Sequence, residues 1–295
     1  MTDPCPILRF APSPNGELHL GHAFSALFTQ AMARHLGGRF LLRIENTDQA
    51  RYRPEFEAGI VDDLHWLGVV WEEPVRRQSD HLPDYAATLA TLRALGLLYP
   101  CFASRKAIAE AASRAEPPLG RDPDGAPLYP GLYRGADPTE AASRIAAGEP
   151  YALRLDMEKA LAFALRVNDG PLFFDRFDET GGLKRIEAHP ERWGDVVLSG
   201  KERPATYHLA VVTDDALQGV THVTRGMDLF AATDIHRLLQ VLLGLPAPLY
   251  CHHRLILDAS GRKLAKSQRD KSLRALRSEG VSAAEIKRQL GFERG

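Results

Sequence analysis

Short apolar runs alternate with longer helical patterns near the start of the chain, and this alternation limits the possible folds more than any other feature. The first apolar run covers residues 7–11 and ends in the turn-rich segment 12–16, and a second run covers 39–45. Apolar side chains recur at helical spacing from Leu20 and again after Pro54. Strands that alternate with helices in this way predict a parallel α/β sheet with right-handed crossovers.

The pattern changes after residue 99, where Ala, Arg, Pro and Gly become frequent. Residues 104–136 are expected to form a helix and an irregular loop, because Pro and Gly interrupt them repeatedly. Short strands are expected after this loop, at residues 151–156, 163–167 and 196–199. This stretch therefore reads as an insertion into the α/β pattern.

Strand and helix patterns resume near residue 207. Strands are expected at 207–213 and 219–225, followed by a helix whose apolar face carries Leu229, Ile235, Leu238, Leu239 and Leu242. The later segment, from Leu273 to Leu290, predicts one or two short helices.

These patterns predict one Rossmann-like α/β domain that is split by an inserted, smaller α+β domain. The two halves of the main domain are expected at residues 1–99 and 206–257, and the insertion at 100–205. Residues 258–295 are expected to form a loop and short helices, which are too few for a further domain.

Composition limits the possible partners and the cellular compartment of the protein. Lys and Arg number 37 against 38 acids, so net charge does not indicate a nucleic-acid partner, although basic residues cluster between Arg262 and Arg277. Alone, such a cluster is more typical of a solvated helix face. Cys5, Cys101 and Cys251 lie far apart, which argues against a disulfide framework. We expect a cytoplasmic protein without a signal peptide and without a membrane partner.

Residues 19–22, His-Leu-Gly-His, come between the first strand and the first helix. A helix N-terminus offers backbone N–H groups to phosphate, and two imidazoles three residues apart could donate to phosphate oxygens. Gly21 would let a base or ribose approach the backbone. For four residues alone, a helix cap with two surface histidines is the simpler interpretation. A zinc site is less favoured, because no third ligand is nearby.

Residues 261–267, Gly-Arg-Lys-Leu-Ala-Lys-Ser, form the second motif. Lys263 and Lys266 lie three residues apart on a glycine-led loop, from which ammonium groups could follow charge onto a leaving pyrophosphate. Alone, a solvated basic loop would explain this segment equally well.

Together, the two motifs resemble the paired ATP-binding motifs of class I aminoacyl-tRNA synthetases. Nucleotidylyltransferases share the first motif but rarely this form of the second. Segments 9–16, 42–48 and 223–229 look like the glutamyl and glutaminyl branch of that family, and the resemblance covers nearly the whole chain. It implies a class I type of sheet, with the second motif as the family's mobile loop.

The resemblance also assigns roles. It places the amino-acid pocket at Arg9, Phe10, Ala11, Pro12, Ser13, Glu45, Tyr207 and Arg225. It places catalysis at His19, His22, Lys263 and Lys266, and ATP binding at Gly21, Lys266 and Ser267. The chemistry agrees, because two arginines could hold the carboxylates of glutamate while a glutamate side chain takes its ammonium group.

Members of that branch carry a zinc site in the insertion, made by a Cys-x-Cys pair, a tyrosine and a further cysteine. Here only Cys101 and Tyr129 match, because Ala103 and Tyr133 occupy the other two positions. Two candidate ligands are too few for a closed structural site, so we expect no zinc.

The resemblance implies activation of L-glutamate by ATP with Mg²⁺, without need of tRNA, followed by transfer to RNA. Only 28 residues follow Ser267 in this sequence, so we expect no anticodon-binding domain after the second motif. The resemblance then favours short paralogues whose acceptor is queuosine in the anticodon of tRNA(Asp). Three alternatives stay open: weak charging of tRNA(Glu), a nucleotidylyltransferase, and a paralogue that only binds.

Overall fold

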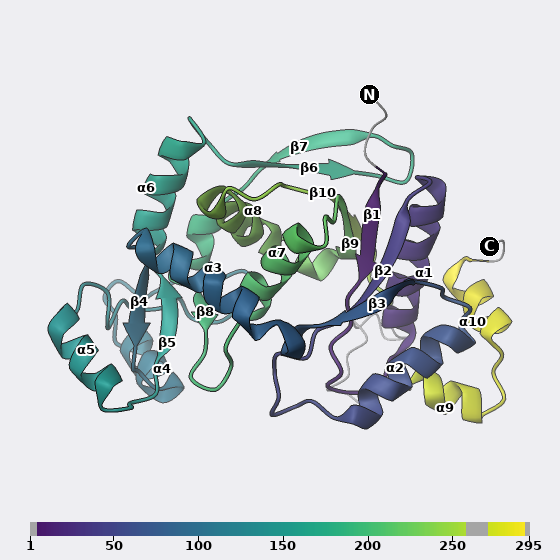
Figure 1. The fold of residues 1–295 in the computed structure, drawn as a ribbon, viewed down its shortest axis with the longest axis horizontal. Helices are drawn as coiled ribbons and strands as arrows, with labels where there is room; N and C mark the ends of the chain where they lie inside the picture. The colour runs from purple at the N-terminus through teal and green to yellow at the C-terminus, as the bar shows by residue number, and fades with distance from the viewer. Residues whose placement is uncertain (1–4, 258–270, 293–295) are drawn as a thin grey trace.

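A computed structural model of the chain describes residues 5–257 and 271–292 (Figure 1). The first sheet has the order β1-β2-β3, with β1 at Ile7–Phe10, β2 at Arg39–Ile44 and β3 at Glu72–Arg77, and its strands are parallel. Helix α1 (Leu20–His35) joins β1 to β2, and α2 (Pro54–Trp66) joins β2 to β3. The predicted parallel β–α–β pattern is confirmed.

A second sheet has the order β7-β6-β10-β9. Its strands are β6 (Phe173–Phe177), β7 (Leu183–Glu187), β9 (His222–Gly226) and β10 (Leu249–His253). β10 is parallel to both β6 and β9, whereas β7 is antiparallel to β6. The backbone N–H of Thr221 donates to the carbonyl of Ile7 at 3.0 Å, so the edge near β9 is joined to β1.

A third, antiparallel sheet lies in the inserted stretch and has the order β4-β5-β8. Its strands are β4 (Leu98–Cys101), β5 (Ala152–Leu155) and β8 (Val197–Ser199). The neighbouring helices are α3 (Leu82–Ala94), α4 (Arg105–Ser113), α5 (Pro138–Ala146) and α6 (Met157–Val167). The inserted stretch therefore forms its own sheet and also supplies the β6–β7 hairpin to the second sheet (Figure 1).

Two expected strands are wrong. Residues 163–167 belong to α6, in which Met157, Ala160 and Ala164 are buried at helical spacing and Asp156 caps the first turn. Residues 207–213 begin helix α7 (Tyr207–Leu217), whose residues 209–215 are all buried. A short run that is apolar on every side does not distinguish a strand from a buried helix, which explains the second error.

The remaining elements complete the packing around two cores. Helix α8 (Ala232–Leu243) packs in the core shared by α3, α6 and α7. Helices α9 (Leu273–Ser278) and α10 (Ala283–Leu290), expected from the sequence, add Leu273, Ile286 and Leu290 to the core around α1 and α2. Short 3-10 turns lie at Gln78–His81, Pro190–Trp193 and Met227–Leu229. Among the described helices, none is long and apolar enough to cross a membrane.

Candidate active site

A cavity of about 480 Å³ opens where β1, β2, β9 and β10 end. The first two strands belong to one sheet and the last two to the other, so the cavity lies at the junction between the sheets. Ligands of open α/β sheets bind outside the carboxyl ends of the strands at such a junction. The lining includes Arg9, Phe10, Ala11, Pro12, Ser13, His19, Gly21, His22, Glu45, Tyr207 and Arg225.

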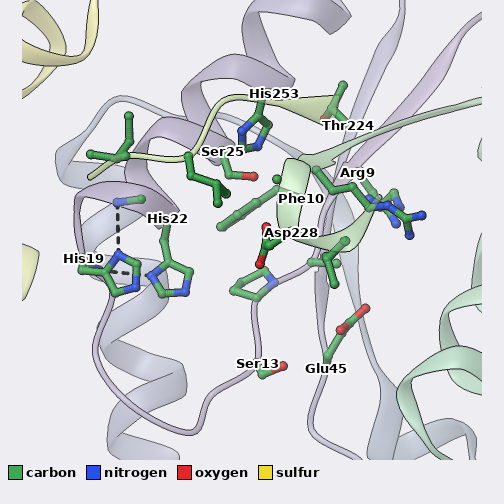
Figure 2. A pocket seen from close by; sticks show the side chains of 18 of the residues that line it. Arg9, Phe10, Ser13, His19, His22, Ser25, Glu45, Thr224, Asp228 and His253 are labelled. Atoms are coloured by element: carbon green, nitrogen blue, oxygen red, sulfur yellow. Dashed lines mark hydrogen bonds between the residues drawn. The ribbon is translucent and has the colours of Figure 1, made fainter. Parts of the chain in front are cut away.

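His19 and His22 lie side by side at the start of α1, with ring centroids 3.9 Å apart (Figure 2). His19 Nδ1 accepts from the backbone N–H of Gly21 at 3.1 Å, and His22 Nδ1 accepts from the backbone N–H of His19 at 3.2 Å. Both rings therefore cap the helix. In a neutral ring whose Nδ1 accepts, the proton is on Nε2, so each histidine has a side-chain N–H donor as well as a capping role.

The absence of a side chain at Gly21 has a specific steric reason. A Cβ at this position would lie 2.9 Å from Cε1 of the His19 ring. The expected close approach to the Gly21 backbone is therefore used by the His19 ring, which needs that room to reach its capping position.

Arg9, at the end of β1, is held by Asp215 of α7. Its Nε donates to Oδ1 at 2.9 Å and its Nη2 to Oδ2 at 3.3 Å. Asp215 also accepts from Nη1 of the fully buried Arg43 at 2.7 Å. One edge of the Arg9 guanidinium is thus occupied inside the protein. A ligand carboxylate has to meet its Nη1 end instead of the Nε–Nη2 edge.

Glu45 stands at the end of β2, across the cavity from the two histidines (Figure 2). Its Oε1 lies 3.5 Å from Nη2 of Arg43, and its side chain is 10% exposed. Burial raises the pKa of this carboxyl to about 6, although Arg43 and Arg9 act in the opposite direction. At neutral pH the group is an anion that gains from a cationic ligand group.

Arg225 is the penultimate residue of β9 and is 4% exposed. Its Nη1 lies 3.5 Å from the hydroxyl of Tyr207, the first residue of α7. Arg9, Glu45, Tyr207 and Arg225 thus line one cavity, although they come from sequence segments more than a hundred residues apart. Lys263, Lys266 and Ser267 lie outside the described residues.

Several lining residues were not predicted. Ser25, Thr224, Asp228, His253 and Arg254 line the same cavity. Thr224 and Asp228 fall inside the segment that resembles the synthetase branch, so the motif marked their neighbourhood but not their place. His253 and Arg254 lie at the end of β10 and directly after it. Because β10 was not predicted as a strand, nothing in the sequence pattern indicated that these two residues belong to the site.

Three of the four positions that correspond to the zinc ligands of the synthetase branch make other contacts in this structure. Cys101 Sγ lies 3.3 Å from the hydroxyl of Tyr129, so these two positions do meet. The hydroxyl of Tyr133 accepts from Nη1 of Arg144 at 3.3 Å, and the Arg144 guanidinium lies 4.0 Å from the centre of the Phe102 ring. Within residues 5–257 and 271–292, no group of three or more His, Cys, Asp or Glu could hold a metal ion.

Comparison with known proteins gives one consistent picture. Residues 7–290 match the family model for the catalytic domain of class I tRNA synthetases (E and Q). The chain is 48% identical to the glutamyl-Q tRNA(Asp) synthetase of Rhodobacter capsulatus, over 97% of this chain and 100% of that relative. It is 38% identical to the glutamyl-Q tRNA(Asp) synthetase of Symbiobacterium thermophilum, over 97% of this chain and 86% of that relative.

A solved structure is similar in fold to this chain. The crystal structure of a glutamate tRNA ligase from Elizabethkingia meningosepticum, in complex with its amino acid, matches with a TM-score of 0.70 at 28% identity. The match covers 94% of this chain and 54% of that ligase, so this chain spans about half of the ligase's length.

Proposed function

Because the chain belongs to the class I tRNA synthetases for glutamate and glutamine, we propose that it activates L-glutamate with ATP and transfers it to queuosine in the anticodon of tRNA(Asp). The observation that carries the proposal is the shared cavity. It combines two buried arginines and a carboxylate that is only 10% exposed with a pair of histidines at a helix N-terminus.

Glutamate fits one side of this cavity by charge. Its side-chain carboxylate would meet Arg225 and the Nη1 end of Arg9, while its ammonium group would meet Glu45. Ser13 and Tyr207 would add hydroxyl hydrogen bonds. The α-carboxylate would then lie toward His19 and His22, which stand on the other side of the cavity from Arg9 and Glu45 (Figure 2).

ATP fits the side of the histidines. An oxygen of the α-carboxylate attacks the α-phosphorus, the bond to the bridging oxygen breaks, and pyrophosphate leaves with the displaced electron pair. The start of α1 and the Nε2 donors of His19 and His22 would stabilise the charge that develops on the phosphates. Lys263, Lys266 and Ser267 are proposed to act on the pyrophosphate, and Mg²⁺ is expected to arrive with ATP as part of the substrate.

Transfer follows from the adenylate. A hydroxyl of the queuosine cyclopentene-diol attacks the carbonyl carbon and loses its proton to the departing phosphate or to water. The bond between that carbon and the phosphate oxygen breaks, AMP leaves with the electron pair, and glutamate remains as an ester on the nucleoside. We propose that residues 100–205 hold the anticodon loop, and that the reaction takes place in the cytoplasm, which the three free cysteines fit.

We also propose that no structural zinc is bound. The residues do not fit the ion, because only Cys101 and Tyr129 come together, Ala103 has no ligating atom, and the hydroxyl of Tyr133 accepts from the cationic Arg144. A closed zinc site requires four ligands, and a neighbouring guanidinium opposes a divalent cation.

Pyrophosphate exchange into ATP tests the activation step directly. It would be measured with each of the twenty amino acids, with and without tRNA. We expect exchange with glutamate, without tRNA, and little with glutamine. Exchange with another amino acid alone, or none at all, would refute the proposal.

A further inference from the structure

Arg225 is held by neutral groups. Its Nε donates to His252 Nε2 at 3.2 Å, its Nη1 lies 2.9 Å from His236 Nδ1, and its Nη2 donates to Thr233 Oγ1 at 2.6 Å. Its guanidinium carbon also lies 5.1 Å from the centre of the Tyr250 ring. None of the ion pairs in the described part of the chain includes Arg225.

The hydrogen bonds determine the tautomers of these histidines. Arginine is always the donor, so His236 Nδ1 must accept and the His236 proton lies on Nε2. That Nε2 lies 3.2 Å from His208 Nδ1 and donates to it. His252 Nε2 accepts from Arg225 in the same way. The rings of His236 and His252 are therefore neutral acceptors for Arg225. The ring of His208 is a neutral acceptor for His236.

Burial keeps the rings neutral. His236 and His252 are 2% and 5% exposed. Burial, with the nearby Arg225 charge, lowers the pKa of His208 to about 4 and that of His252 to about 2, and it lowers the pKa of His236 well below its usual range. At neutral pH these rings hold Arg225 without adding charge of either sign.

Arg9 offers the contrast within the same cavity. It is paired with Asp215, which also pairs with Arg43. Arg43 is paired with Asp214 and Glu45 as well, so both Arg9 and Arg43 have carboxylate partners inside the protein, whereas the hydrogen-bond acceptors of the Arg225 guanidinium are neutral.

We propose that His236, supported by His208, and His252 are positioning residues that hold Arg225 in place while leaving its charge uncompensated, and that this charge selects the anionic side chain of glutamate over the amide of glutamine. The inference rests on the proposed function. A carboxylate at the position of either imidazole would fix Arg225 equally well, but would neutralise it and remove its advantage for an anionic ligand.

Two variants of His236 separate position from charge. Asn and Asp have nearly the same shape, and each can place an Oδ1 where Nδ1 now accepts. We expect His236→Asn to keep the glutamate KM within a few-fold of the parent. We expect His236→Asp to raise the glutamate KM by about tenfold or more, with a smaller change in kcat, and to lower the ratio of glutamate to glutamine kcat/KM.

A second pair repeats the comparison at another atom of the same guanidinium. His252→Gln and His252→Glu both place an oxygen near Nε2, and only the second adds charge. The His252 variants also keep the comparison possible if His236→Asp does not fold. Thermal melting and the KM for ATP serve as controls, because the ATP side lies at His19 and His22.

The outcomes are separable. If the charged variants keep the parent's selectivity, or if the neutral variants lose as much as the charged ones, the inference is wrong. If the unmodified protein does not activate glutamate, the proposed function itself fails, whatever the variants do.

Discussion

Asp215 holds Arg9 by one edge of its guanidinium, through contacts of 2.9 and 3.3 Å. Asp215 also binds the fully buried Arg43, so this carboxylate is shared between two buried cations. Asp215→Asn should therefore cost about 3 kcal/mol of unfolding free energy and raise the glutamate KM, because Arg9 loses its anchor. Denaturant unfolding and exchange kinetics measure the two effects.

The matched control for this change is Asp175→Asn. Asp175 pairs with Arg185, but on the exposed hairpin β6–β7, with side chains 36% and 69% exposed. A pair of this kind contributes about 1 kcal/mol or less. Equal stability losses in the two variants would show that the Asp215 cluster is not the buried network described above.

One substitution can separate the capping contact of His22 from its proposed catalytic role. In His22→Asn, the amide oxygen can still accept from the backbone N–H of His19, but the Nε2 donor is gone. We expect pyrophosphate exchange to fall by about a hundredfold. The unfolding free energy should fall by less than about 1 kcal/mol, and His22→Ala should lose both the cap and the donor. A normal exchange rate in His22→Asn would remove His22 from the catalytic set.

If Glu45 receives the substrate ammonium group as proposed, glutamate binding should depend on pH. Its pKa is raised to about 6, so the carboxylate that would receive the substrate ammonium becomes protonated as the pH falls through that value. The glutamate KM should therefore rise below about pH 6. In Glu45→Gln it should be high at every pH and lack this step. A wild-type KM that stays flat from pH 8 to pH 5 would contradict the assignment.

The raised pKa of Glu45 should also make the folded state less stable as the pH increases. A raised carboxyl pKa means that the folded state favours the protonated form. The stabilisation is fully present below the unfolded value of 4.5 and is lost as the pH rises through about 6. The loss amounts to about 2 kcal/mol, and it should be absent from the unfolding curves of Glu45→Gln.

Local motifs were easier to predict than tertiary neighbours. His19 and His22 lie within one helical turn, so their spacing alone brings the rings together. Arg9 lies within the first predicted strand and Glu45 ends the second, and because the two strands are parallel neighbours, both residues lie toward the same edge of the sheet. The partners of the two arginines were not predicted. Asp215 and His236 are buried on helices α7 and α8, and nothing in their local pattern distinguishes them from ordinary core positions.

The zinc prediction has a gain-of-function test. We expect elemental analysis of protein purified without a metal-affinity tag to find no stoichiometric zinc. The double substitution Ala103→Cys with Tyr133→Cys restores the thiols of the related site and removes the hydroxyl that binds Arg144. This variant should gain zinc. Stoichiometric zinc in the unmodified protein would show that other residues provide the ligands.

The acceptor is the central claim, and one transfer measurement tests it most directly. Radiolabelled glutamate and ATP would be given with tRNA(Asp) that carries either queuosine or guanosine at the same anticodon position. Both tRNAs would lack the 3′-terminal adenosine, and intact tRNA(Glu) would serve as the competing acceptor. We predict that label enters only the queuosine tRNA, and that periodate oxidation of its cyclopentene-diol abolishes the transfer. Label on the 3′ end of tRNA(Glu), with none on the queuosine tRNA, would contradict the account.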